Sequence, residues 1–207
     1  MIDCGADWLQ LVHRVKPSAI VLTHAHPDHV DGLRRGAPCP VYAPPAVWRA
    51  IERWPIGDRY RLRPGLATAI RGIHFEMYGL DHSVIAPAAG YRITAGGATV
   101  FYAPDVLRIR NPASALTDIT LYIGDGATVT RPILRVERRK HVPVGHASIA
   151  TQLAWCAQSG VRRACFTHCG RGIVVGPPQI EAHIRELGRA QRVETQVASD
   201  GLEMIVR

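Results

Sequence analysis

Four potential metal ligands follow one short apolar segment near the N-terminus. Residues 19–23 read AIVLT, which predicts a buried strand, and they run directly into the letters HAHPDH. In extended backbone, residues two apart point to the same side, so His24 and His26 can converge on one ion. The proline then turns the chain, and Asp28 and His29 begin a helical turn directed toward a second point. The segment therefore predicts half-shells of ligands for two neighbouring metals.

The residue types in this segment also indicate which metals to expect. Imidazole nitrogens combined with a carboxylate oxygen suit zinc, and manganese or iron are the alternatives. A dense, buried group of histidines and an aspartate would carry a large desolvation cost if no metal were bound. We therefore expect two Zn²⁺ ions, or Mn²⁺ or iron in their place, at the end of the predicted strand.

Length and composition are those of an ordinary globular chain. We expect a single domain over residues 1–207, which is long enough for a well-formed core. Hydrophobic residues make up 47%, and no apolar run reaches the roughly 20 residues that a membrane span needs. The N-terminus lacks a basic region followed by an apolar stretch, so we expect a cytoplasmic protein without a signal peptide. Five cysteines without a Cys-x-x-Cys pair predict free, mostly buried thiols.

Short apolar runs alternate with amphipathic stretches along the chain, which is typical of a layered α/β domain. Besides residues 19–23, we predict strands at 41–43, 72–78, 90–94, 99–103, 119–123, 164–167 and 202–206. Helices are predicted at 6–15, 45–54, 148–158 and 178–187, with Gly160 and Gly188 as stop signals after two of them. The letters AGG at 95–97 predict a hairpin turn.

The formal net charge of +8 comes almost entirely from arginine. Arginine suits bidentate binding of phosphate oxygens and favours an anionic substrate, although a bias toward arginine in the composition explains the charge equally well. One basic run stands out near the middle of the C-terminal half, and it comprises Arg131, Arg135, Arg138, Arg139, Lys140 and His141. This run predicts either a loop that contacts phosphate or nucleic acid, or a solvated basic loop.

The segment THAHPDHVDG, residues 23–32, resembles the signature of the metallo-β-lactamase superfamily. The resemblance implies an αββα sandwich with two metals at one edge and with further ligands in later loops. His82 in GLDHS, Asp105 in FYAPD and His168 in CFTHCG follow in the order that the family shows. Carried over to this sequence, the ligands form two sets that share a bridging Asp105: His24, His26 and His82 for one metal, and Asp28, His29 and His168 for the other.

Later segments resemble one branch of that superfamily, which contains ribonuclease Z and small phosphodiesterases. HSVIAPAAGYRI, residues 82–93, is similar to its ligand histidine and the Gly-Tyr-Arg strand that follows. DITLYIGDGAT resembles a segment that ends in His-Glu-Ala-Thr, with Asp125 in place of the glutamate, and His146 in VGHAS matches a histidine that is not a ligand. The C-terminal letters ASDGLEMIV resemble the closing strand of small phosphodiesterases.

The resemblance implies a hydrolase in which a hydroxide bridging two metals attacks a phosphodiester. Asp28, His146 and Asp125 are the expected catalytic residues, with His146 protonating the leaving alkoxide and Asp125 orienting its ring. The local sequence leaves other interpretations open. His146 could be a core or helix-capping residue beside a capping Ser148, and Asp125 could be a turn aspartate between two glycines.

Two departures from the family pattern affect these expectations. The family has one or two strands before the Asp-Cys-Gly turn, and this sequence starts at that turn, so we expect the first strand or strands to be missing and consider a homodimer. Ribonuclease Z grips tRNA with an extended arm, whereas residues 33–81 are compact here. We therefore expect cleavage of a small nucleotide or cyclic phosphodiester. The alternatives are a 3′-tRNA-processing endonuclease acting on RNA, a thioester or lactone hydrolase, and a nucleic-acid-binding scaffold without catalysis.

Overall fold

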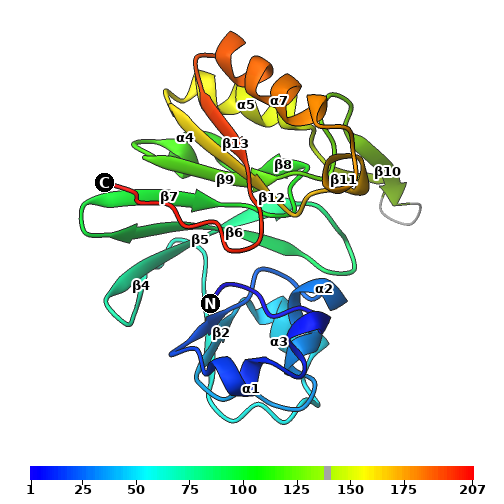
Figure 1. The fold of residues 1–207 in the computed structure, drawn as a ribbon. Helices are drawn as coiled ribbons and strands as arrows, with labels where there is room; N and C mark the ends of the chain where they lie inside the picture. Colours follow the sequence, from blue (N-terminus) through cyan, green and yellow to red (C-terminus); the bar gives the residue numbers. More distant parts are fainter. Residues whose placement is uncertain (138–140) are drawn as a thin grey trace.

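Two β-sheets of unequal size face each other, and helices cover the outer side of each (Figure 1). The computed structural model describes residues 1–137 and 141–207. The smaller sheet is parallel and has the order β1-β2-β3, whereas the larger sheet has the order β13-β12-β9-β7-β6-β5-β4, with β8 paired to β5. These layers form the predicted αββα sandwich.

The strands of the smaller sheet are β1 (Ile20–Val21), β2 (Val41–Ala43) and β3 (Arg59–Arg61). Those of the larger sheet are β4 (Thr68–Ile70), β5 (Ile73–Asp81), β6 (Ala88–Ala95), β7 (Ala98–Tyr102), β8 (Arg108–Ile109), β9 (Leu121–Asp125), β12 (Arg163–Thr167) and β13 (Glu194–Val197). A separate hairpin is formed by β10 (Ile133–Glu137) and β11 (Val142–His146).

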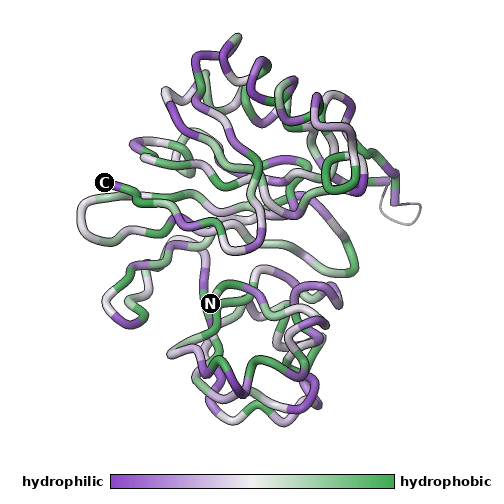
Figure 2. The backbone as a smooth tube through the Cα atoms, in the orientation of Figure 1, coloured by the Kyte–Doolittle hydropathy of each residue, from purple (hydrophilic) through white to green (hydrophobic). Residues whose placement is uncertain are grey.

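Helical segments account for most of the outer layers. Around the smaller sheet they are η1 (Ala6–Trp8), α1 (Val12–Val15), α2 (Pro27–Val30), η2 (Asp31–Leu33) and α3 (Pro45–Ala50). Beside the larger sheet they are α4 (Pro112–Leu116), α5 (Ile149–Gln158), α6 (Arg171–Val174) and α7 (Gln179–Ala190). Figure 2 shows that hydrophilic and hydrophobic residues alternate along the upper helices, as amphipathic packing on a sheet requires.

Three apolar clusters fill the three spaces between the layers. Strand β1 takes part in two of them, because Ile20 packs among the helices of the smaller sheet and Val21 packs between the two sheets. This double burial follows from the alternation of side chains along a strand, and it explains the uninterrupted apolar letters before His24. The third cluster lies under α5 and α7 and includes the buried rings of Phe101, Tyr122 and Phe166.

The predicted hairpin turn is confirmed between β6 and β7, where Gly96 and Gly97 have φ values of +56° and +84°. Positive φ at both central residues is what a tight two-residue hairpin turn needs, and glycine adopts it without strain. The antiparallel strands β5, β6 and β7 then give way to the parallel strands β7, β9, β12 and β13.

Two expectations at the C-terminal end are wrong. No strand lies over residues 202–206 of the described chain; the edge strand is β13, and Leu202, Met204 and Val206 instead line a hollow beside the large sheet. The alternating apolar letters therefore reflect contact with a sheet face and not strand pairing. Gly188 does not end a helix, since α7 continues to Ala190. A Cβ at this position would lie 2.1 Å from Thr195 Oγ1, so glycine here permits close packing of α7 on β13.

Other boundaries differ in length or type. The expected helix at 6–15 is divided into η1 and α1, and the helix expected at 45–54 ends at Ala50. Strands β3, β4, β8, β10, β11 and β13 were not predicted. Of the basic run, Arg135 lies on β10 and not in a loop, His141 directly precedes β11, and Arg138, Arg139 and Lys140 lie outside the described residues.

The fold also shows the state of the cysteines and the character of the helices. All five cysteines are among the described residues and are free thiols; Cys4, Cys156 and Cys165 are buried, and Cys39 and Cys169 are half-buried. Among the described residues, no helix combines the length and the apolar character that crossing a membrane would require.

Candidate metal centre

The HAHPDH segment leaves the smaller sheet and turns into α2 with its side chains directed at one point. His26 has extended backbone and precedes the helix, and Pro27 occupies the first helical position, where a proline costs no hydrogen bond. His24 is completely buried, and its Nε2 lies 2.9 Å from His26 Nδ1. The predicted change from strand to helical turn is thus present in the structure.

The first set of ligand candidates, which we call the histidine half, consists of His24, His26 and His82. His82 directly follows β5, and its Nε2 lies 3.3 Å from His26 Nδ1. Its other nitrogen, Nδ1, lies 3.0 Å from the carbonyl oxygen of Gly145 on β11, which fixes the ring. Burial lowers the pKa of all three imidazoles and brings that of His24 to about 2. The histidine half therefore presents neutral nitrogens, which is the form that binds a metal.

The second set, which we call the mixed half, consists of Asp28, His29 and His168. His168 follows β12, and its Nε2 lies 3.2 Å from Asp28 Oδ2, which in turn lies 3.5 Å from His29 Nε2. Burial opposes protonation of both histidines, but the neighbouring carboxylates outweigh it and raise the pKa of His29 to about 12 and that of His168 to about 10. Unlike the histidine half, the mixed half therefore holds protons when no metal is bound.

Asp105 lies between the two halves. Its Oδ2 is 2.7 Å from His29 Nε2 and 3.7 Å from His24 Nε2, and its Oδ1 is 3.6 Å from both His82 Nε2 and His168 Nδ1. Burial alone would raise the pKa of this carboxyl, yet the surrounding imidazoles hold it well below its usual range. The Nδ1 atom of a fifth imidazole, His146, lies 3.5 Å from Asp105 Oδ1. A buried anion among five imidazoles is the position expected of a bridging ligand.

Buried atoms without a hydrogen bond indicate that the arrangement fits metal ions. His29 Nε2 and Asp105 Oδ2 lie 2.7 Å apart but without hydrogen-bond geometry, and these two atoms and His168 Nδ1 are buried and make no hydrogen bond among the described residues. Orphaned polar atoms of this kind carry a large cost unless another partner is present. One ligand nitrogen from each residue of the histidine half lies within 4.8 Å of the other two, and one ligand atom from each residue of the mixed half does so as well. Nitrogen and carboxylate donors at this spacing fit two divalent cations such as Zn²⁺.

Next to both halves, His146 forms a close pair with Asp125. His146 ends β11 and Asp125 ends β9, and the distance from His146 Nδ1 to Asp125 Oδ2 is 2.7 Å. The ring of His146 is 4.8 Å from that of His82 and 5.7 Å from that of His168, measured between centroids. Asp125 therefore engages the Nδ1 atom of the ring.

The structure also tests the alternative interpretations of Asp125 and His146. The alternative for Asp125 is correct, whereas the helix-capping alternative for His146 is not. Asp125 accepts hydrogen bonds from the backbone N–H groups of Val106 and Ala127, at 3.0 and 2.8 Å, so it is also a turn aspartate. His146 does not cap the following helix. That position belongs to Ser148, which accepts from the Thr151 N–H at 3.2 Å, as the sequence predicted.

Sequence reasoning missed Gln152, a buried side chain on α5. Its amide nitrogen donates to the carbonyl oxygens of Asp125 and Ala147, at 2.7 and 3.2 Å, and its oxygen accepts from the Asp125 N–H at 2.9 Å. Gln152 thus holds together the ends of the two strands that carry Asp125 and His146. A lone glutamine in a helix gives no sequence signal for such a role.

Sequence reasoning also missed the function of Asp3. Its Oδ2 lies 2.7 Å from His29 Nδ1, and its two carboxylate oxygens accept from the N–H and the hydroxyl of Thr23 at 2.7 and 2.8 Å. The carboxylate therefore orients a ligand of the mixed half and ties the N-terminal turn to the end of β1. Such an outer partner is common for metal-binding histidines, but only the fold shows which aspartate supplies it.

Known proteins resemble this chain in sequence and in fold. The model of the beta-lactamase superfamily domain matches residues 1–169. A ribonuclease Z from Mycolicibacterium paratuberculosis is 26% identical, over 85% of this chain and 77% of its own length. Zn²⁺-bound PqqB from Methylobacterium extorquens has a TM-score of 0.70 at 19% identity, covering 97% of this chain and 81% of that chain. A diphosphatase of the PhnP family has a TM-score of 0.67 at 20% identity, covering 99% and 79%.

The fold and the clustered histidines and aspartates define a metal-dependent hydrolase of the metallo-β-lactamase type. The chain belongs to the beta-lactamase superfamily, whose domain model covers more than three quarters of its length. Its resemblance to ribonuclease Z and to PhnP-like diphosphatases is distant.

Proposed function

We propose that this chain is a phosphodiesterase that cleaves a small nucleotide or cyclic phosphodiester. The observation that carries the proposal is the His146–Asp125 pair, with 2.7 Å between Nδ1 and Oδ2, placed against both halves of the metal centre. An alkoxide leaving group needs a proton, and a histidine held by a carboxylate is suited to supply it. The distant similarity to ribonuclease Z and to a PhnP-family diphosphatase supports phosphoryl chemistry.

Two divalent cations, when bound by the histidine half, the mixed half and the shared Asp105, supply activation of water and neutralisation of the phosphoryl charge. Zn²⁺ suits the donor set, and Mn²⁺ or iron are alternatives. The side chain of Asp28 is 60% exposed, so we assign it the additional role of accepting a hydrogen bond from the attacking water. His146 protonates the departing oxygen through Nε2, while Asp125 holds the ring and stabilises its charged form.

A second candidate is a 3′-tRNA-processing endonuclease. The ribonuclease Z relatives favour it, and so does the basic Arg131–Arg135 portion next to the β10–β11 hairpin. Against it, residues 33–81, the region expected to be compact, form only α3, the short strands β2, β3 and β4, strand β5 and their connections, which offer no extended arm for gripping tRNA. We therefore rank a small diester ahead of RNA.

The remaining alternatives fit the site less well. A thioester hydrolase expels a thiolate, which needs no dedicated proton donor of the His146 type, and the distant similarity to ribonuclease Z and to a PhnP-family diphosphatase favours phosphoryl chemistry over lactone opening. A nucleic-acid-binding scaffold without catalysis would be free to lose its ligands, whereas seven candidate ligand side chains are brought together here.

The proposal is tested by loading the protein with Zn²⁺, Mn²⁺ or Fe²⁺ and assaying small phosphodiesters, cyclic nucleotides, precursor tRNA, thioesters and lactones. We expect turnover of the small diesters to exceed that of every other class. Preferential turnover of thioesters or lactones would overturn the proposal, and preferential cleavage of precursor tRNA would replace it with the second candidate.

His146→Ala tests the observation that carries the proposal. Metal content should remain near two ions per chain, because His146 belongs to neither half. Turnover of diesters with poor leaving groups should fall by about 10² or more, whereas a nitrophenyl diester should lose less, since its leaving group needs little protonation. Equal losses on both substrates, or loss of metal, would remove His146 from the role of proton donor.

A further inference from the structure

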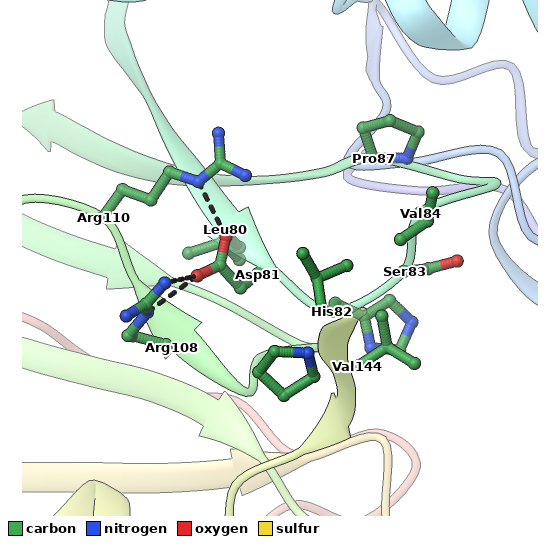
Figure 3. Close-up of a pocket in the computed structure, with 11 residues that line it drawn as sticks. Leu80, Asp81, His82, Ser83, Val84, Pro87, Arg108, Arg110 and Val144 are labelled. Atoms are coloured by element: carbon green, nitrogen blue, oxygen red, sulfur yellow. Dashed lines mark hydrogen bonds and ion pairs between the residues drawn. The ribbon is translucent and has the colours of Figure 1, made fainter. Parts of the chain in front are cut away.

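A pocket of about 420 Å³ opens directly beside the metal centre on the side of the histidine half (Figure 3). Its apolar walls come from Leu80, Val84 and Pro87 on one side and from the first residues of β11 on the other. The metal-ligand candidate His82 is part of its lining, so a molecule bound at the metals can extend into this space. Two arginines also line the pocket: Arg108 lies on β8, and Arg110 directly follows that strand.

The two arginines are held in place by the sheet itself. Strand β8 pairs with the end of β5, which sets Arg108 opposite Asp81, and the Arg110 N–H donates to the Gly79 carbonyl at 3.0 Å. The side chain of Arg110 lies across Gly79, where a Cβ would come within 3.2 Å of Arg110 Cδ. The glycine therefore leaves room for the arginine to reach the pocket.

One carboxylate serves both guanidinium groups. Arg108 Nε and Nη2 lie 2.7 and 2.6 Å from Asp81 Oδ2, and Arg110 Nε lies 2.7 Å from Asp81 Oδ1 (Figure 3). Two positive charges against one negative charge leave a net charge of +1 at the pocket wall. Both arginine side chains remain well exposed, at 74% and 69%, so their outer N–H groups can reach a ligand.

The position of the proton donor shows which part of a substrate would enter this pocket. Val144, in the pocket wall, is two residues before His146 on the same strand, and the rings of His82 and His146 are 4.8 Å apart. The group protonated by His146 is the leaving group, so the leaving group lies on the pocket side of the reacting phosphorus.

The opposite side of the metal centre has different chemistry. A hollow of about 490 Å³ next to the mixed half is lined by Asp3, Asp7 and Asp28, together with the ring of Trp8. Carboxylates repel an anionic substituent, whereas the ring suits a neutral, flat group. The two sides of the centre therefore differ in sign of charge.

We propose that the pocket is a leaving-group subsite in which Arg108 and Arg110 select phosphodiesters whose departing alcohol carries a second anionic group, a phosphate or a carboxylate. The apolar walls accommodate the organic part of that alcohol, and the arginines bind its charge through N–H groups that Asp81 leaves free. This inference rests on the phosphodiesterase function proposed above and adds the class and the orientation of the substrate.

The test uses three matched substrates of the metal-loaded enzyme. Methyl 4-nitrophenyl phosphate has no additional charge, methyl 3-carboxy-4-nitrophenyl phosphate carries an anion on the leaving group, and 2-carboxyethyl 4-nitrophenyl phosphate carries it on the other alcohol. We expect kcat/KM to be about tenfold higher for the second substrate than for the first, and lower for the third, with the preference weakening as salt concentration rises.

Arg108→Gln and Arg110→Gln should each reduce kcat/KM for the substrate with the charged leaving group about tenfold, and at least fivefold more than for the neutral substrate. Arg110→Lys keeps the charge and should recover part of the preference. The matched control is Arg185→Gln, which removes an exposed arginine that pairs with Glu181 on α7, far from this pocket, and should change none of the three values. Thermal unfolding of each variant separates a binding defect from misfolding.

The outcomes are distinguishable. Turnover of the neutral diester with no arginine-dependent preference would overturn the subsite and leave the phosphodiesterase function standing. Preference for the third substrate would overturn the orientation. Lack of turnover of all three diesters, with two metals bound, would overturn the proposed function and this inference together.

Discussion

The histidine half and the mixed half face each other across Asp105, yet their ligands are prepared for metal in different ways. In the histidine half, burial removes protons from the imidazoles, and His82 is oriented by a backbone carbonyl. In the mixed half, carboxylates add protons to His29 and His168, and Asp3 orients His29. Two adjacent sites of similar ligand number therefore differ in charge, in proton content and in the kind of outer support.

This difference teaches that ligand identity alone does not define how a site binds metal. The neutral histidine half can accept a cation without giving up a proton. The mixed half must first release protons, but it offers more negative charge once they have left. We expect the histidine half to fill first under mildly acidic conditions, and the following predictions test this from the largest expected effect to the smallest.

Asp105→Ala should have the largest effect, because it removes the carboxylate that lies between the two halves. We expect loss of at least one metal per chain and a fall in turnover of more than about 10³. Elemental analysis of the purified variant measures the first effect and a diester assay the second. Asp200→Ala, at an exposed position near the C-terminus, is the control; unchanged metal stoichiometry in Asp105→Ala would eliminate the bridging role.

Acidification should separate the two halves. With pKa values raised to about 12 and about 10, His29 and His168 are protonated at pH 6 to 8 in the metal-free protein and must lose those protons to bind metal. Affinity in the mixed half should therefore fall by up to about 100-fold per pH unit, whereas the histidine half, with lowered pKa values, should change little between pH 7 and 8.

Calorimetric titration with Zn²⁺ in buffers of different ionisation enthalpy counts the released protons at each step. Equal proton release for the first and the second ion would remove the distinction between the halves.

Asp3→Asn should weaken only the mixed half. The amide keeps the size of the side chain but removes the charge that orients His29, and loss of such an outer partner typically costs about 10- to 100-fold in metal affinity. Competition with a chelator should show one weakened ion and one unchanged ion. Asp7→Asn, a nearby exposed aspartate, serves as the matched control, and weakening of both ions would contradict the assignment of Asp3 to one half.

Gln152→Leu should leave the metal content of both halves unchanged, so its expected effect on metal binding is the smallest. It removes four hydrogen bonds, to Asp125, to Ala147 and from the buried Tyr122 hydroxyl, while keeping the volume buried, so the free energy of unfolding should fall by about 1–3 kcal/mol. Because Gln152 positions the His146–Asp125 pair, kcat should fall while both ions remain. Denaturant unfolding and metal analysis measure the two outcomes; loss of metal would show that the pair and the halves are not independent.

The dense segment from His24 to His29 could be predicted because the spacing of its ligand side chains changes from the period of a strand to that of a helix within a few residues. The later ligand candidates His82, Asp105 and His168 carry little information on their own, and the family resemblance supplied their order. Their convergence depends on β5, β7 and β12 ending at the same edge of one sheet. No local pattern encodes that meeting point.

Other features could not be read from the sequence for physical reasons. The short strands β8, β10 and β11 are defined by their partners and not by a strong alternation of their own. The ion-pair cluster of Asp81, Arg108 and Arg110 joins residues almost thirty positions apart. Glycine is common just after the end of a helix, but Gly188 lies inside α7, where close packing on β13 overrides that preference.

Three consecutive residues of β11 serve three different purposes, and this restricts how the molecule can change. Val144 lines the pocket, the Gly145 carbonyl holds the ring of His82, and His146 faces Asp125. Any attempt to enlarge the pocket for a bulkier alcohol by replacing Val144 will shift the backbone that supports a metal ligand and the acid. Redesign of specificity in this protein should therefore begin at Pro87, which lies in the opposite wall and five residues from His82.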